Sequence, residues 1–183
     1  MTNDIYDGKN PQNIARGATS RAQGAMFENI ISASCDYYRE QGYCYIEKTP
    51  EPFRVTQAMR NHTAFTGHFA KKAQPDFKGV LKNGRAIVIE AKHTDTKRIS
   101  KDRISDTQAA ALDQYAAMQA HCYVAVSFGL QSIYLIPWDI WRNMELIMGR
   151  KYITEDDIQT YKRRFTGTIA YLFGEAVKNE KQA

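Results

Sequence analysis

The sequence lacks the features that mark several large classes of protein. Its 3 cysteines have no C-x-x-C spacing, so neither a disulfide framework nor a zinc knuckle is expected, and a reducing cytoplasm is the natural compartment. No apolar run is long enough for a membrane span, and no signal peptide is evident, so we expect no membrane partner. Neither a G-x-x-x-x-G-K loop nor a G-x-G-x-x-G turn occurs, so we expect no nucleotide cofactor.

The composition is that of an ordinary folded domain with a surplus of positive charge. Of the 183 residues, 43% are hydrophobic and 25% are charged, which is typical of a globular chain rather than a disordered one. Lysine and arginine outnumber aspartate and glutamate by 25 to 20, giving a net charge of +5. A surplus of this size favours a polyanionic partner without identifying it.

The hydrophobic pattern predicts a single α/β domain with a mixed sheet flanked by helices. Residues 1–17 are polar and aperiodic, so we interpret them as a flexible arm, and residues 179–183 as a flexible C-terminus, around a domain at 18–178. The first expected helix begins near Thr19 and ends at Gly42, a second covers 106–120, and two more begin at Pro137 and at Thr154. The expected strands cover 43–47, 77–81, 85–90, 122–127 and 132–136.

One long segment, residues 49–73, interrupts this pattern. Pro50 and Pro52 stand near its start, and basic residues are spread through the rest of it. The segment fits either a long loop or an extended two-stranded arm. An insertion of this length in a compact domain is usually functional or mobile.

Two carboxylates and a lysine are expected to meet at the ends of two neighbouring strands. Asp76 starts one strand, Glu90-Ala91-Lys92 ends the next, and an Asn-Gly pair between them favours a hairpin. Glu90 and Lys92 share a face because they are two residues apart, and the hairpin brings Asp76 beside them. Carboxylates and the Ala91 carbonyl suit Mg²⁺, which would polarise a phosphodiester while Lys92 orients a water. By itself the pattern also fits a solvated salt bridge.

Two further polar residues are candidates for the same site. Glu28 lies next to the apolar face of the first helix and could reach the same metal, although this position also fits an ordinary exposed glutamate. Gln108, near the start of the helix at 106–120, could hold a phosphate or the attacking water. Neither residue would be singled out without the carboxylate pair.

Basic residues gather where a phosphate backbone would need them. They lie in the N-terminal region, in the 49–73 segment and directly after the carboxylate motif, and they include Arg21, Arg54, Arg60, Lys71, Lys72, Lys97 and Arg98. Each of these clusters also fits a solvated surface. We therefore treat them as candidate DNA-binding residues whose role depends on the nature of the site.

The series of motifs resembles the PD-(D/E)xK nuclease superfamily and, more narrowly, the RecU-type Holliday junction resolvases of bacteria and their phages. The matching stretches are GAMFENII around Glu28, Ile46-x-Lys48-Thr49-Pro50, Asp76-Phe77-x-Gly79, Ile89-Glu90-Ala91-Lys92-x-Thr94, Gln108 with Leu112, and Tyr134-x-Ile136-Pro137. They cover roughly residues 16–158, in the order of the family. The resemblance implies a restriction-endonuclease-like αβββαβ core in which residues 49–73 form a protruding stalk.

The same resemblance implies a homodimeric, Mg²⁺-dependent endonuclease, with Mn²⁺ as a substitute, that resolves four-way DNA junctions by paired nicks in recombination and repair. It places Glu28, Asp76, Glu90 and Lys92 on the active-site positions, Gln108 on a downstream glutamine, and Thr94 on a threonine that follows the motif. Two alternatives stay open at this point. One is a nuclease of the same fold that acts on other duplex or branched DNA, and the other is a non-catalytic junction-binding module.

Overall fold

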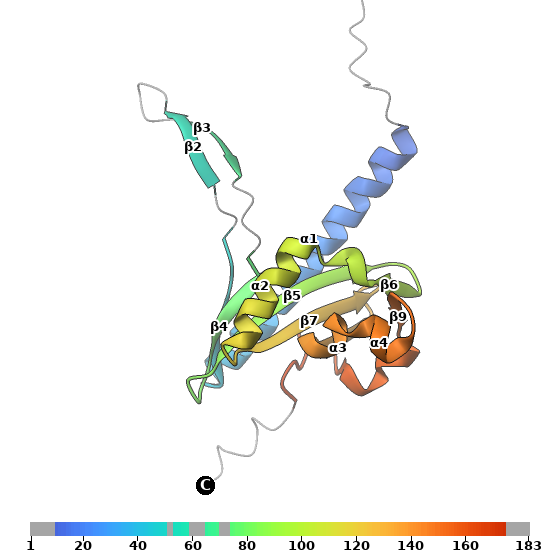
Figure 1. Cartoon of the computed structure of the whole chain (residues 1–183). Coiled ribbons are helices and arrows are strands. Elements are labelled where there is room, and N and C mark those ends of the chain that lie inside the picture. Colours follow the sequence, from blue (N-terminus) through green and yellow to red (C-terminus); the bar gives the residue numbers. More distant parts are fainter. Residues whose placement is uncertain (1–9, 51–52, 59–64, 70–73, 175–183) are drawn as a thin grey trace, which may run out of the picture.

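The computed structural model describes residues 10–50, 53–58, 65–69 and 74–174 of the chain. Its centre is a six-stranded mixed sheet in the spatial order β1 (Cys44–Lys48), β4 (Phe77–Leu81), β5 (Ala86–Thr94), β7 (His121–Phe128), β8 (Ser132–Pro137) and β10 (Lys162–Arg163). Neighbouring strands are antiparallel except β5 and β7, which run parallel. The expected mixed sheet is therefore confirmed (Figure 1).

Helices cover both faces of this sheet. They are α1 (Pro11–Glu40), α2 (Asp106–Ala117), α3 (Trp138–Arg142) and α4 (Met144–Met148), with 3-10 turns at Lys101–Arg103 and Asp156–Tyr161. The parallel pair β5 and β7 needs a crossover connection, and α2 lies within it. Without β2, β3 and β6, the order through β7 is αβββαβ, as the sequence resemblance implies.

Alternation along β5 divides the core into two clusters. Ile87, Ile89 and Ala91 pack on the α1 side with Phe27 and Ile31, which are at most 1% exposed. Val88 belongs to the other cluster, which is built around Leu112 of α2, the two tryptophans of α3, and residues of β7 and β8. Because successive side chains of a strand point to opposite faces, Glu90 and Lys92 face the α2 side of the sheet.

The first helix begins earlier than its hydrophobic pattern predicts. The Asn10 side chain accepts a hydrogen bond from the Gln12 N–H, and Pro11 occupies the first turn, where its missing N–H costs nothing. Residues 11–17, which the sequence assigned to the arm, are therefore helical, and that boundary was wrong. The other end is as expected, because Gly42 follows the helix with a φ of +66°.

The 49–73 segment contains an antiparallel pair of strands, β2 (Phe53–Ala58) and β3 (Phe65–Phe69), with a register shift between Val55 and Gln57. Of the two interpretations, the two-stranded arm is therefore confirmed. Figure 1 draws this pair apart from the main sheet. Arg54 lies in β2, whereas Arg60, Lys71 and Lys72 lie outside the described residues.

A second pair of short strands was not predicted. The strands β6 (Arg98–Ser100) and β9 (Tyr152–Thr154) pair antiparallel beside α4 (Figure 1). Ile99 and Ile153 are each 2% exposed and anchor the pair to the core on the α2 side. None of the strands expected from the sequence includes these residues, and Thr154, where a helix was expected to begin, ends β9 instead. In the described part of the chain, no helix has the length and apolar character needed to span a membrane.

Candidate active site

The hairpin between β4 and β5 brings the two predicted carboxylates together. Phe77 pairs with Ile89, so Asp76, one residue before β4, lies opposite Glu90. Asp76 Oδ2 accepts a hydrogen bond of 2.8 Å from the Ala91 N–H, which fixes the carboxylate against β5. The Asn83-Gly84 turn permits this register because Gly84 adopts a φ of +81°, a conformation that glycine tolerates without strain.

Glu90 is the central group of the site. Its side chain is 0% exposed, and its Oε1 atom accepts hydrogen bonds from Lys92 Nζ at 2.7 Å and from Gln108 Nε2. Its other oxygen, Oε2, is buried and has no hydrogen-bond partner among the described residues. A buried carboxylate oxygen left unpaired is costly, so this atom is the one in the site that most needs a ligand.

Burial also raises the pKa of both carboxyl groups. Desolvation and the negative charge of Asp76 raise the pKa of Glu90 to about 7, against the opposing attraction of Lys92. Desolvation likewise raises the pKa of Asp76, and the negative charge of Glu28 adds to that rise. Two ionised carboxylates in one buried spot repel each other, and a hard cation would relieve both the repulsion and the unpaired oxygen. The donor set therefore fits a divalent metal ion.

Glu28 approaches this pair from α1 without joining it. Its Oε2 atom lies 2.8 Å from Lys48 Nζ, and its side chain is partly exposed. Among the described residues, no three Asp, Glu, His or Cys side chains converge as a ready-made metal cage. A Mg²⁺ ion commonly uses only one or two protein carboxylates and completes its shell with water and substrate phosphate oxygens. Asp76 and Glu90 suffice for that kind of site.

The Gln108 side chain contacts Glu90. Ser105 caps α2, and its Oγ atom accepts a hydrogen bond from the Gln108 N–H. Gln108 Oε1 in turn accepts a hydrogen bond from the Ser105 N–H, and its Nε2 donates to Glu90. The S-x-x-Q spacing is visible in the sequence, but nothing local in the sequence indicates the contact with Glu90.

The candidate DNA-binding residues are placed unevenly. Thr94 ends β5 on the same face as Glu90 and Lys92, and its hydroxyl lies 2.9 Å from that of Thr96. Lys97 and Arg98 are exposed directly after it, and Arg21 is exposed on α1. The side chain of Arg54 and all of Arg60, Lys71 and Lys72 fall outside what the structure describes.

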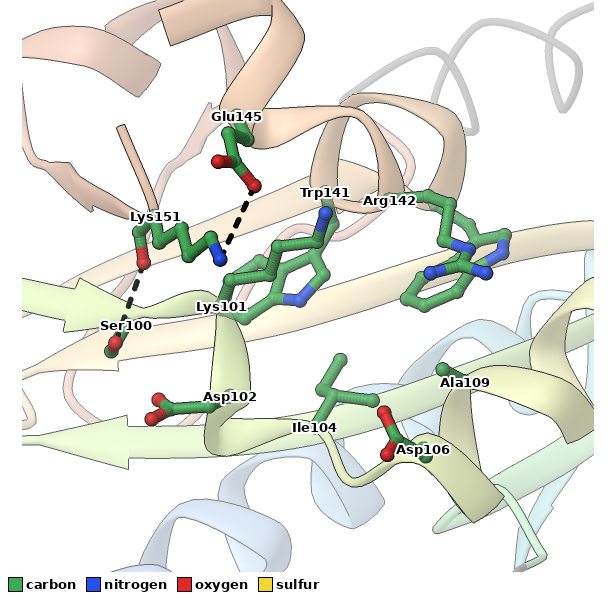
Figure 2. A pocket seen from close by; sticks show the side chains of 11 residues that line it. Ser100, Lys101, Asp102, Ile104, Asp106, Ala109, Trp141, Arg142, Glu145 and Lys151 are labelled. Carbon is green, nitrogen blue, oxygen red and sulfur yellow. Dashed lines mark hydrogen bonds and ion pairs between the residues drawn. The ribbon is translucent and has the colours of Figure 1, made fainter. Parts of the chain in front are cut away.

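A cavity of about 380 Å³ lies elsewhere, between β6, α2, α3 and α4 (Figure 2). Ile104 and Trp141 form part of its apolar lining, and its rim carries both acidic and basic side chains, including Asp106 and Lys151. None of the candidate catalytic residues lines it. The carboxylate pair and this cavity are therefore separate features of the structure.

Comparison with known proteins decides the family. The profile of the family described as Recombination protein U (RecU) matches residues 22–175. The chain belongs to the RecU family. Two relatives, each called Holliday junction resolvase RecU, come from Streptococcus pneumoniae serotype 19F (strain G54) and S. pneumoniae (strain Taiwan19F-14). They are 31% and 32% identical over 158 residues, which is 82% of this chain and 76% of each relative.

A solved structure, that of the Archaeoglobus fulgidus Holliday junction resolvase Hjc, also matches. It is 16% identical and covers 75% of this chain and 88% of its own, with a TM-score of 0.43. The RecU family match spans Glu28, Asp76, Glu90, Lys92 and Gln108, so the whole carboxylate site lies in the family region.

Proposed function

We propose that this RecU-family chain is a metal-dependent endonuclease that resolves four-way DNA junctions by paired, symmetric nicks in DNA recombination and repair. The observation that carries the proposal is the buried pair Asp76 and Glu90, with Lys92 beside it and one carboxylate oxygen unpaired. The names of relatives at 31–32% identity support the junction as substrate. Paired nicks suit a twofold enzyme, so we propose that the chain works as a homodimer in the cytoplasm.

We assign Mg²⁺, with Mn²⁺ as a substitute, to Asp76, Glu90 and the Ala91 carbonyl, with Glu28 assisting. When bound, the ion would supply Lewis-acid polarisation of the phosphodiester and lower the pKa of a water. Gln108 holds Glu90 through Oε1, which leaves Oε2 for the ion. Lys92, whose ammonium lies 2.7 Å from Glu90, orients the attacking water or stabilises negative charge on the phosphate.

The DNA-binding residues are assigned by their place around this site. We propose that residues 49–73 form a stalk that enters the junction centre, with Arg54, Arg60, Lys71 and Lys72 facing phosphates there. Thr94, Lys97 and Arg98 would hold the strand that passes the carboxylates, and Arg21 would hold a neighbouring arm. Such contacts supply affinity and orientation without reading sequence, which is what a junction enzyme requires.

Substitution of Asp76 by Asn tests the assignment of the metal site. Asp76→Asn keeps the size of the side chain but removes a charge that faces phosphates, so cleavage should be abolished while junction binding is kept or strengthened. Asp36→Asn, on α1 and paired with Arg39 outside the site, is the matched control and should cleave normally. Retained cleavage in Asp76→Asn would contradict the assignment.

A further inference from the structure

The two-stranded β6–β9 ribbon, residues 98–100 with 152–154, has one face in the core and one in solvent. Arg98 pairs with Thr154, and Ser100 with Tyr152. Ile99 and Ile153 lie between these positions and face the core at 2% exposure. Because side chains alternate along a strand, the two pairs together form the outer face of the ribbon. Arg98 has already been assigned to the strand at the carboxylates, and Ser100 lines the cavity, whereas Tyr152 and Thr154 belong to no site described so far.

Two guanidinium groups are gathered on the outer face around one aromatic ring. The Arg98 and Arg150 Cζ atoms each lie 4.9 Å from the centre of the Tyr152 ring. Asp157 holds Arg150 and also accepts hydrogen bonds from Thr154, through N–H at 2.7 Å and Oγ at 2.8 Å. The Tyr152 ring restricts both arginines, and Asp157 also holds Arg150, so less side-chain entropy is lost when an anion binds.

Further positive charge lies at one end of the ribbon. Lys97 is exposed directly before β6. In the described part of the chain, neither Lys97 nor Arg98 forms an ion pair with a carboxylate. These two cations therefore face solvent without local neutralisation. The surface therefore presents the positive charges of Lys97 and Arg98 beside the guanidinium group of Arg150, which Asp157 holds in place.

Hydrogen bonds connect the segment that follows β6 to the strand that carries the carboxylate site. Arg103 Nη2, in the 3-10 turn after β6, donates to the carbonyl of His93, near the end of β5, at 3.1 Å. The Lys101 N–H donates to the Lys151 carbonyl at 2.8 Å, which closes the end of the ribbon. Since β5 carries Glu90 and Lys92, a phosphate backbone bound on the ribbon would lie at a fixed position relative to the reacting phosphate.

We propose that the outer face of the β6–β9 ribbon binds the phosphate backbone of a duplex arm of the substrate. Lys97 and Arg98 supply the positive charge, Arg150 adds N–H donors held in place by Asp157, and the Tyr152 hydroxyl donates to a phosphate oxygen. This inference rests on the proposed action on DNA and extends the contact already proposed for Lys97 and Arg98 to Tyr152 and Arg150. A duplex arm is common to junctions and linear DNA, so the ribbon should contribute to the binding of both.

The test measures binding of a labelled four-way junction and of linear duplex at several salt concentrations. The parent and every variant carry Asp76→Asn, so that the DNA is not cleaved. Arg98→Ala and Tyr152→Ala should each weaken binding to both DNAs several-fold. Arg98→Ala should also lower the slope of log affinity against log salt by about one, because one phosphate contact is lost. Arg98→Lys should keep the parent slope, and Lys82→Ala, in the β4–β5 turn, should leave both quantities unchanged.

The outcomes separate this inference from the proposed function. If the parent binds the junction, and Arg98→Ala and Tyr152→Ala bind it with the same affinity and the same salt slope, the proposed DNA contact on the ribbon is overturned. The proposed function is then unaffected. Loss of junction binding alone, with linear duplex unaffected, would also overturn a duplex-arm contact. A parent chain that binds neither DNA would overturn the proposed function itself. Thermal unfolding of each variant identifies any loss caused by misfolding, and Tyr152→Phe then tests the hydroxyl with the ring retained.

A second inference rests on separate contacts at the start of α2. Gln108 Oε1 accepts from the Ser105 N–H and lies 3.1 Å from Ser105 Oγ, so its oxygen end is held by the cap. The amide can then present only its Nε2 donor to Glu90. We infer that Ser105 is a positioning residue, which acts through Gln108 to hold Glu90 by Oε1 and keep Oε2 available for the metal.

Metal binding gives this inference a readout that does not depend on cleavage. Mn²⁺ affinity, measured by electron paramagnetic resonance on the full chain, should fall roughly tenfold in Gln108→Ala, which removes the residue that directly holds the proposed ligand Glu90. It should fall by a smaller but measurable factor in Ser105→Ala, which loses the Oγ contact and keeps the N–H. Ser105→Thr, which still caps the helix, should have the Mn²⁺ affinity of the parent. In a chain that already carries Gln108→Ala, adding Ser105→Ala should lower the Mn²⁺ affinity little further. Unchanged Mn²⁺ affinity in Ser105→Ala would overturn the inference, whereas a parent chain that binds no Mn²⁺ would overturn the metal centre itself.

Discussion

The metal-free fold should be destabilised by the buried carboxylate of Glu90, and Glu90→Gln should remove that effect. Burial raises the pKa of Glu90 from 4.5 to about 7. The folded carboxyl group therefore binds its proton more tightly than the unfolded one does. Its contribution to stability is fully present below about pH 4.5 and is lost as the pH rises through about 7. Glutamine stays neutral and can still accept through its amide oxygen.

The size of this effect follows from the same shift. A rise from 4.5 to about 7 corresponds to on the order of 3 kcal/mol of unfolding free energy, lost by the metal-free chain above neutral pH. Glu90→Gln also gives up the ion pair with Lys92, which lies 2.7 Å away and is 16% exposed, so part of the gain is offset. The pH dependence, rather than the absolute stability, is therefore the quantity to compare.

Urea unfolding in EDTA at pH 5 and pH 8 measures this difference. The stability of Glu90→Gln relative to the parent should increase from pH 5 to pH 8. When Mg²⁺ replaces EDTA at pH 8, the parent should be stabilised and the variant should not. Glu40→Gln, exposed at the end of α1, is the control and should track the parent at both pH values. A difference between parent and Glu90→Gln that does not change with pH would refute the reasoning.

Three other predictions concern packing and the stalk. Gly79→Ala would place a Cβ atom 2.0 Å from the carbonyl oxygen of Tyr45, so β1 must move away from β4. Urea unfolding should show that the free energy of unfolding falls by several kcal/mol, and an unchanged value would contradict this close approach. Leu112→Ala, at a fully buried position of α2, should cost about 2–5 kcal/mol in the same assay, and a cost near zero would contradict its burial. Arg60→Ala and Lys72→Ala should weaken junction binding with little effect on linear duplex, and an equal loss on both DNAs would count against the stalk.

Much of the carboxylate site could be predicted because its signals are local. The hairpin turn, the apolar strand and the i, i+2 spacing of Glu90 and Lys92 lie within a short stretch, and they alone place Asp76 beside Glu90. The contact from Gln108 was missed because it depends on how α2 packs over β5. The pairing of Glu28 with Lys48 was missed for the same reason, since it depends on the position of α1 against β1.

The errors in the fold also have physical causes. The first turns of α1 carry mostly exposed side chains and so have no apolar stripe, although Asn10 and Pro11 form a readable start signal. The β6–β9 ribbon is built from two three-residue strands, each with a single buried isoleucine, far apart in the chain. Such short strands gain their stability from long-range pairing and anchoring, which local periodicity does not report.

The most direct test of the central claim is cleavage of a labelled four-way junction beside linear duplex of matching sequence, with Mg²⁺ and with EDTA. The account predicts paired, symmetric nicks in the junction that require Mg²⁺, with linear duplex left intact. Equal cutting of both DNAs would contradict the choice of substrate. Binding of the junction without any Mg²⁺-dependent cutting would contradict the nuclease itself.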